Sequence, residues 1–393
     1  MNLVDFENRP EQLTIFLKGH IDSNNSPEVE TRIIEILQET PNEVLVLDLS
    51  ELEYISSAGL RIILRLRKDY PELKIVEANP EVYEILSMTG FTEMMTVEKA
   101  YRRISVEGCE VIGKGANGVV YRIDPDTIVK VYSHENALSE IKQERELARK
   151  AFVKGIPTAI SYDVVRVGDY FGSVFELLNA DSFARILSKE PERFEEVARL
   201  SADLLLKIHN TELEPGELPD MKQKALDWVG YCEPFLAPEL YQKLRALVEA
   251  VPETHSMLHG DYHLKNVMLQ NGESLLIDMD TLCMGHPIFE FGSVFNAYRG
   301  FSLLDHENVK SFIGIDYDTA SRFLHRLLAL YLDTEDEARI QEVIDKAEIL
   351  GITRLLRRDV RRGGLETEEG RERIDFYKSE LARLLPVTDT LCF

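Results

Sequence analysis

Cysteine is scarce in this sequence of 393 residues: Cys109, Cys232, Cys283 and Cys392 lie far apart and form no CxxC pair. Neither a disulfide framework nor a zinc site is therefore indicated. No apolar stretch approaches the roughly 18 residues that a membrane-spanning helix needs, and the N-terminus lacks the basic and apolar regions of a signal peptide. These absences predict a protein of the reducing cytoplasm with no membrane partner.

Positive charge is also in deficit. Lysine and arginine total 45 against 69 aspartates and glutamates, which gives a formal charge of −24. This is the wrong sign for a protein that binds nucleic acid or anionic lipid through bulk charge. The 44% hydrophobic and 29% charged composition is typical of a globular protein, and the length predicts two or three domains.

The first hundred residues alternate between strands and helices. Strands are predicted at residues 12–22, 43–49 and 73–78, and a helix follows each of them. The middle run is apolar almost throughout, as a strand covered on both faces and paired in parallel would be. Residues 1–104 are therefore predicted to form an α/β sheet-and-helix domain.

The pattern changes after residue 104. Residues 106–178 are typical of an antiparallel sheet interrupted by one helix over 135–153, and residues 182–393 carry long helical stripes. The chain is predicted to be multidomain, α/β followed by α+β. The predicted domains are 1–104, 105–179 for a small lobe, and 180–393 for a helical lobe.

A glycine-rich loop opens the second region. GKGANGVV at 113–120 fits G-x-G-x-x-G-x-V through Gly113, Gly115 and Gly118. A strand, a DPDT turn and a second strand follow, whereas a dinucleotide-binding fold requires a helix there. No GxxxxGK[ST] occurs, which excludes a Walker-type loop. The glycines are predicted to form a lid between two strands that covers nucleotide phosphates.

Lys130 lies in the second strand of this hairpin, between valines, where an ammonium group needs an anion. Nucleotide phosphates would supply one. Glu140 and Glu144 follow on one face of the next helix, and the spacing favours Glu144 as the partner of Lys130. Taken alone, these residues favour the simpler interpretation of an exposed lysine on an edge strand beside a solvated acidic helix face.

The most specific pattern is HGDYHLKN at 259–266, followed by Asp278 at the end of the apolar strand SLLID. Phosphoryl transfer needs a carboxylate that accepts the proton of the incoming hydroxyl, and oxygen ligands that hold Mg²⁺ against the nucleotide phosphates. Asp261 suits the first role, and Asn266 with Asp278 the second. The sequence therefore predicts a kinase-like site for ATP and Mg²⁺.

Other polar residues have simpler explanations. His209 and His263 are interpreted as hydrogen-bonded structural histidines, since the chemistry already has a base. Asp280 either supports the metal ligands from outside the ligand set or is a carboxylate satisfied by local backbone. The basic run from Arg354 to Arg362 fits an anion site or, more simply, a solvated helix face, and is left out of the site.

With these motifs, residues 106–393 resemble the aminoglycoside phosphotransferase and choline kinase group of the protein-kinase-like superfamily. HGDYHLKN is similar to the group's HGDxxxxN loop, and Asp-Met-Asp at 278–280 stands where protein kinases carry DFG. The resemblance implies transfer of the γ-phosphate of ATP to a hydroxyl-bearing small molecule or protein. It also implies that Glu176 and Leu178, at the hinge between lobes, meet adenine through backbone groups. Glu290 stands where the group commonly has Asp.

Residues 1–104 resemble the STAS domain of anti-sigma-factor antagonists in LKGHIDSNNSPEVE, VLVLDLSELEYISSAGLRIIL and NPEVYEILSMTGFTEMM. The resemblance implies an anti-sigma-factor-like protein partner and a phosphorylated serine, for which Ser57 is the first candidate and Ser56 the second. Ser56 replaces a common acid, and Ala58 stands where some members carry the modified serine. The alternative is a helix cap without signalling.

Two functions follow. The first is a kinase coupled to a regulatory STAS domain. The second is a signalling antagonist whose STAS domain binds a partner and is phosphorylated by its own or another kinase. The acceptor, the oligomeric state and the task of the STAS domain stay open.

Overall fold

The computed structural model describes residues 3–115, 117–134 and 137–393. Position 116 of the glycine loop and positions 135–136 of the helix expected over 135–153 lie outside the described residues. The chain forms two compact units, one built from the residues up to Glu107 together with Val164–Gly172, the other from Gly108–Asp163 and Ser173–Phe393. The domain boundaries expected at 104/105 and 179/180 stay predictions.

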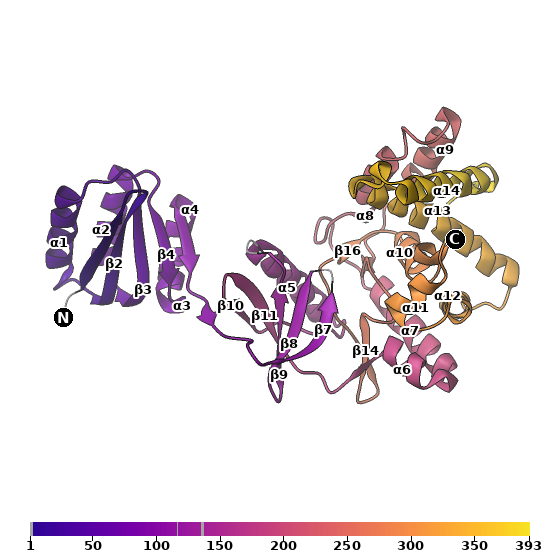
Figure 1. Ribbon diagram of the computed structural model, residues 1–393, viewed down its shortest axis with the longest axis horizontal. Coiled ribbons are helices and arrows are strands. Elements are labelled where there is room, and N and C mark those ends of the chain that lie inside the picture. Colours follow the sequence, from indigo (N-terminus) through magenta and orange to yellow (C-terminus); the bar gives the residue numbers. More distant parts are fainter. Residues whose placement is uncertain (1–2, 116, 135–136) are drawn as a thin grey trace. The chain divides into compact units, whose positions relative to one another are not determined.

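The first unit is a sheet with the strand order β1-β2-β3-β4-β5 in its described part. Strands β2 to β5 pair in parallel, as the apolar run predicts, and β1 adds an antiparallel edge. Helices connect the parallel strands (Figure 1). The elements are β1 (Val4–Arg9), β2 (Gln12–Ile21), α1 (Ser26–Glu39), β3 (Leu45–Ile55), α2 (Ser57–Asp69), β4 (Lys74–Ala78), α3 (Pro80–Met88), α4 (Phe91–Met94) and β5 (Thr96–Lys99).

The core of this unit follows from the helical period of about 3.6 residues and the strand period of two residues. Helix α1 buries Val29, Ile33 and Ile36 at helical spacing, and β2 buries every second residue along most of its length. Strand β3 runs to Ile55, beyond the predicted end at residue 49, and its last residue leads directly into the cap of α2. Strand β1 was not predicted because only Val4 of its six residues is buried.

A short strand pair departs from the antiparallel arrangement predicted for 106–178. Strand β10 (Asp163–Val167) pairs in parallel with β6 (Arg102–Arg103), with Val165 opposite Arg102. Since the partner strand lies before residue 106, the pattern within 106–178 could not reveal this pairing.

The small lobe of the second unit contains the predicted hairpin. Strands β7 (Glu110–Gly115), β8 (Gly118–Asp124) and β9 (Thr127–Tyr132) pair in order, with Val120 opposite Lys130. Helix α5 (Leu138–Val153) and the part of β11 (Tyr170–Glu176) from Ser173 onward complete the lobe. A Cβ at Gly118 would lie 2.1 Å from the carbonyl oxygen of Val131, so this backbone approach requires glycine.

The larger lobe is mainly helical. Its helices are α6 (Phe183–Lys189), α7 (Phe194–His209), α8 (Met221–Gly230), α9 (Pro238–Glu249), α10 (Ile288–Tyr298), α11 (Glu307–Ile313), α12 (Tyr317–Tyr331), α13 (Glu337–Arg361) and α14 (Glu368–Leu384). Its strands are β12 (Asp181–Ser182), β13 (Met257–Leu258), β14 (Val267–Gln270), β15 (Glu273–Leu276) and β16 (Cys283–Met284), and short 3₁₀ turns cover 191–193, 300–302, 364–366 and 385–387. No helix within the described ranges is long and apolar enough to cross a membrane.

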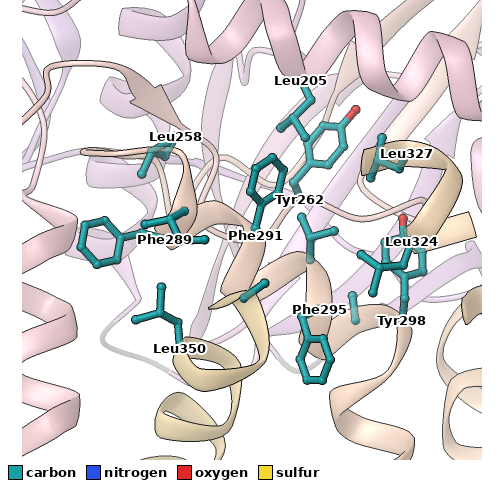
Figure 2. Packing of buried hydrophobic residues seen from close by; sticks show 14 of the residues in the cluster. Leu205, Leu258, Tyr262, Phe289, Phe291, Phe295, Tyr298, Leu324, Leu327 and Leu350 are labelled. Atoms are coloured by element: carbon teal, nitrogen blue, oxygen red, sulfur yellow. The ribbon is translucent and has the colours of Figure 1, made fainter. Parts of the chain in front are cut away.

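Helix α10 is the centre of this lobe, since every one of its residues is buried. Figure 2 shows Phe289, Phe291 and Phe295 of α10 among side chains from other elements. The helix approaches α13 closely: a Cβ at Gly292 would lie 2.9 Å from Cβ of Leu350. This close packing fixes α10 and α13 relative to each other, and both helices send side chains to the loop described next.

Candidate active site

A cavity of about 560 Å³ lies in the second unit. Every residue that the sequence analysis assigned to nucleotide, metal or catalysis lines it. These are Gly113, Gly115, Gly118, Lys130, Glu144, Glu176, Leu178, Asp261, Asn266 and Asp278. The structure therefore gathers residues from the glycine loop, the hinge, α5 and the HGDYHLKN loop around one space. Ser56 and Ser57 belong to the first unit.

Lys130 joins the two sides of this cavity. Its Nζ lies 3.1 Å from Oε1 of Glu144 and 3.0 Å from Oδ1 of Asp278, and the hydroxyl of Tyr132 donates to Glu144. Glu140 instead contacts His134. Burial would lower the pKa of Lys130, but the charges of Asp278 and Glu144 raise it above its ordinary value. The ammonium therefore stays charged.

Asp278 and Asp280 bring more negative charge to this side. Asp278 adopts a left-handed backbone with φ of 62°, which is uncommon outside glycine. Burial, followed by the charge of Asp278, raises the pKa of Asp280 to about 7. Asn117, in the glycine loop, donates to Oδ2 of Asp280 at 3.2 Å, so one partner of Asp280 lies outside its local backbone.

The donor set fits a hard cation such as Mg²⁺. Asn266 uses its Nδ2 to donate to the carbonyl oxygen of Asp261 at 3.0 Å, which leaves its amide oxygen for a ligand role. Asp278 supplies a carboxylate that already lies beside a charged lysine. Oxygen ligands of this kind are what Mg²⁺ takes in proteins. Among the described residues, no cluster of three or more His, Cys, Asp or Glu forms a dense metal site.

Asp261 lies in the loop between β13 and β14. Burial alone would raise its pKa, but the hydrogen bond and charge of His263, together with Arg354, lower it to about 2. Nε2 of His263 lies 3.5 Å from Oδ2 of Asp261. The carboxylate is therefore ionised at neutral pH and able to accept a proton.

The backbone of this loop is held by Glu290, from the buried helix α10. Its carboxylate accepts the backbone N–H groups of His259 at 2.6 Å, Gly260 at 3.0 Å and Tyr262 at 3.4 Å. Burial would raise the pKa of Glu290, but His209 and His259 and the Gly260 N–H lower it. Glu290 thus holds the loop that carries Asp261, a role that its place in an apolar stretch did not reveal.

Gly260 is the point at which these contacts converge. Its φ is 82°, and a Cβ there would lie 2.4 Å from the carbonyl oxygen of Thr281. Its own carbonyl oxygen accepts the hydroxyl of Ser293 at 3.0 Å and an N–H of Arg354 at 3.2 Å. The backbone N–H of Gly260 is therefore held by α10, and its carbonyl oxygen is held by α10 and α13.

The basic run at the end of α13 is only in part the solvated face that the sequence favoured, since Arg361 and Arg362 are exposed but Arg354, Arg357 and Arg358 are not. Arg354 is half-buried, lines the cavity, and also donates to Ser293. Nε of Arg357 lies 3.4 Å from Asp227, and Arg358 lies over the ring of Phe301. The sequence missed Arg354 because it lies 94 positions from Gly260 and no local motif links the two.

His209 and the two candidate serines have defined environments. His209 is buried, and its Nδ1 lies 2.8 Å from the hydroxyl of Tyr331, as a structural histidine would be. In the first unit, Ser56 is the N-cap of α2 and accepts the N–H of Gly59 at 3.5 Å. Ser57 is exposed at the first residue of the same helix.

With this geometry, the chain defines a kinase-type phosphotransferase with a hydroxyl acceptor. A profile of the Phosphotransferase enzyme family, APH, matches residues 108–343, and a STAS domain profile matches residues 4–104. The chain belongs to this phosphotransferase family and carries an N-terminal STAS domain.

The STAS domain has relatives of known class. A Bordetella bronchiseptica protein, BtrV, assigned as an anti-sigma factor antagonist, is 36% identical over 85 residues, which are 21% of this chain and 72% of BtrV. The anti-sigma F factor antagonist of Paenibacillus polymyxa is 29% identical over 102 residues, which are 25% of this chain and 87% of that protein. These relatives support a regulatory role for the domain.

Solved structures similar to this chain include the GDP complex of aminoglycoside 2'-phosphotransferase-IIIa, with 13% identity and a TM-score of 0.49, covering 77% of this chain and 98% of that one. A thermostable aminoglycoside phosphotransferase APH(4)-Ia in ternary complex with AMP-PNP and hygromycin B has 11% identity and a TM-score of 0.49, covering 72% and 94%.

Proposed function

We propose that the second unit transfers the γ-phosphate of ATP, with Mg²⁺, to a hydroxyl group, and that the STAS domain regulates this activity or is regulated by it. The observation that carries the proposal is the single cavity in which Lys130, Asp261, Asn266 and Asp278 meet beneath the glycine loop. Phosphoryl transfer depends mainly on positioning and charge stabilisation, and this cavity offers both.

The nucleotide side is formed by the small lobe. The glycines leave room for phosphates close to the backbone, and Lys130, aimed by Glu144, binds them. At the hinge, the N–H of Leu177 is already bonded to the carbonyl oxygen of Asp126 at 2.7 Å. The backbone of the flanking residues, Glu176 and Leu178, is therefore what we expect to meet adenine.

The reacting side is formed by the loop around Asp261. Its carboxylate orients the acceptor hydroxyl and takes its proton, while the acceptor oxygen forms a bond to the γ-phosphorus and the bond to the β-phosphate oxygen breaks, releasing ADP. Asn266 and Asp278 would hold Mg²⁺, which neutralises phosphate charge when bound. Glu290, Ser293 and Arg354 act on the chemistry only by positioning Gly260 and the residue after it.

The direct test is the variant Asp261→Asn. We expect Mg-ATP turnover to fall by about 10²- to 10⁴-fold, since the amide cannot accept the proton. Binding of ADP should be kept, because Asp261 lies on the reacting side. Equal turnover by the two proteins would refute the assignment.

A second proposal concerns Ser57 as a phosphate acceptor. Ser57 is exposed at the start of α2, where free N–H groups and the helix dipole favour an anion, while Ser56 is engaged as the cap. A phosphate there would add about −1.5 to −2 charges to a surface that binds an anti-sigma-factor-like partner. Mass spectrometry after incubation with Mg-ATP tests the version in which the chain modifies itself. Phosphate on neither Ser56 nor Ser57 would leave a separate acceptor.

A further inference from the structure

The end of the cavity around Asp261 carries positive charge. Besides Asp261, this end is lined by His263, Lys265, Phe312 and Arg354. The ring of His263 contacts that of Phe312 with centroids 5.0 Å apart, and Nζ of Lys265 lies 5.1 Å from the centre of the same ring. Two permanent cations therefore lie beside one carboxylate, in a protein whose overall charge is strongly negative.

Among the described residues, the other carboxylates that line the cavity form no ion pair with these two cations. Glu144 and Asp278 contact Lys130, Asp280 accepts from Asn117, and Glu176 ends the hinge strand β11. In the described part of the chain, neither Lys265 nor Arg354 lies within 4.0 Å of a carboxylate oxygen. Their charges are therefore not neutralised by an ion pair, unlike that of Lys130.

The two cations come from a different lobe than Lys130 and the glycine loop, which are expected to bind the nucleotide phosphates. Arg354 is fixed by its bond to the carbonyl oxygen of Gly260, next to Asp261, and lies over the ring of Trp228. Lys265 lies over Phe312 of α11, in the helical lobe. Both come from the lobe that presents the catalytic loop, whereas Lys130 and the glycine loop belong to the small lobe.

We infer that the acceptor is a small hydroxyl compound that also carries an oxyanion, a carboxylate or a phosphate, which binds between Lys265 and Arg354 while its hydroxyl faces Asp261. Phe312 contacts the carbon skeleton. A guanidinium pairs well with a planar or tetrahedral oxyanion, and an ammonium adds a mobile point charge. An acceptor with several ammonium groups would instead meet two like charges and is disfavoured.

This inference rests on the proposed function and can fail separately from it. Pairs of acceptors that differ only in the oxyanion, glycerate against glycerol and glucose 6-phosphate against glucose, are compared by ADP release with Mg-ATP on the full chain. Kanamycin serves as the polyamine. We expect kcat/KM for the charged member of a pair to exceed that of its neutral partner by about fivefold or more, because one partly exposed ion pair is worth that much. The carboxylate and phosphate pairs distinguish the two oxyanions.

The variant Lys265→Gln tests the charge alone, because the Lys265 side chain makes no hydrogen bond within the described ranges that would hold the loop. We expect Lys265→Gln to raise KM for the charged acceptor about fivefold, with little change in kcat. The difference in kcat/KM between the charged and the neutral member of each pair should therefore become smaller. Lys310→Gln is the matched control: Lys310 lies on α11, is exposed and pairs with Glu307. It should behave like the wild type.

A binding measurement also tests compounds that bind but are not phosphorylated. Calorimetry with Mg-ADP present measures whether the charged member of each pair binds more tightly than the neutral one, and whether Lys265→Gln removes the difference. Equal binding and equal use within all pairs, or preference for kanamycin, would overturn the inference. If the inference fails but the wild type still hydrolyses Mg-ATP slowly and Lys130→Met abolishes this hydrolysis, the proposed phosphotransferase function stands. If Mg-ADP does not bind at all, the proposed function itself has failed.

Discussion

The two sides of the cavity differ in how their charges are arranged. On the nucleotide side, Lys130 lies between Glu144 and Asp278, so the cation and its carboxylates are already paired. On the acceptor side, Lys265 and Arg354 have no such partner among the described residues. The first arrangement keeps a lysine in place until phosphates arrive, and the second leaves charge available for the acceptor itself.

Among the variants that compare the two sides, the one that breaks the paired side is expected to lower turnover most. Lys130→Met removes the phosphate-binding ammonium and leaves Glu144 and Asp278 facing each other without their cation. We expect Mg-ATP turnover to fall by about 10²- to 10³-fold, as for loss of one preorganised charge-stabilising group. Steady-state ADP release measures this.

The matched control for that change is Lys142→Met, since Lys142 lies on the exposed face of α5 and does not line the cavity. A loss of turnover as large in Lys142→Met would show that the helix, rather than the charge of Lys130, carries the effect.

Glu290 tests how far the reacting side depends on its backbone support. Glu290→Gln replaces an acceptor-only carboxylate with an amide whose NH₂ faces backbone N–H donors, which we expect to cost about 3 kcal/mol in the free energy of unfolding at neutral pH. Because folding lowers the pKa of Glu290, its contribution is present above the ordinary pKa of glutamate and lost as the pH falls through the lowered value.

Urea unfolding of both proteins at neutral pH and at about pH 4 checks this sign. The difference between wild type and Glu290→Gln should shrink at the lower pH. A difference that grows on acidification would contradict the assignment of an ionised, backbone-bound carboxylate.

Comparing Gly260→Ala with Gly155→Ala separates the cost of backbone strain at positive φ from the cost of a steric clash with the new Cβ. Gly260 and Gly155 have nearly equal φ angles, 82° and 85°, but a Cβ at Gly260 meets the Thr281 carbonyl oxygen at 2.4 Å, whereas one at Gly155 meets nothing within 4 Å. Gly155→Ala should therefore cost about 1 kcal/mol for backbone strain alone.

Gly260→Ala should cost at least about 2 kcal/mol more than that and also lower turnover, because Asp261 is displaced. Thermal unfolding and ADP release measure the two effects. Equal stability losses in the two alanine variants would show that the close approach to Thr281 is relieved without consequence.

The sequence predicted one part of this site and missed another. The glycine loop on the nucleotide side and HGDYHLKN on the reacting side were predicted because their residues occur in short motifs with characteristic spacing. The support of the catalytic loop was missed because Glu290 and Arg354 reach Gly260 across separations of 30 and 94 positions. A charged residue in an apolar helix carries no local sign of the backbone that it will bind.

The fold shows the same limit in the first unit. Its parallel strands were predicted because buried strands and amphipathic helices have distinct periodicities. The edge strand β1 was missed, since only Val4 of its six residues is buried and its apolar alternation is limited to Val4 and Phe6. Likewise, the pairing of β10 with β6 was missed because β6 lies before residues 106–178, over which the antiparallel sheet was predicted.

The smallest expected effect concerns the two neighbouring serines of the STAS domain. Ser56→Ala should cost about 1 kcal/mol because Ser56 caps α2, whereas Ser57→Ala should change stability by less than about 0.5 kcal/mol because its side chain is exposed. Thermal unfolding of the two variants measures this. A larger loss in Ser57→Ala would make Ser57 structural and weaken its proposal as a phosphate acceptor.

The account depends most on one nucleotide lying between Lys130 and the loop of Asp261. Calorimetric titration with Mg²⁺ and a non-hydrolysable ATP analogue tests this directly on the wild type, Asp261→Asn and Lys130→Met. We predict equal affinity for the first two and at least about tenfold weaker binding for Lys130→Met, as loss of a partly buried charge contact implies. Unchanged binding in Lys130→Met would contradict the account.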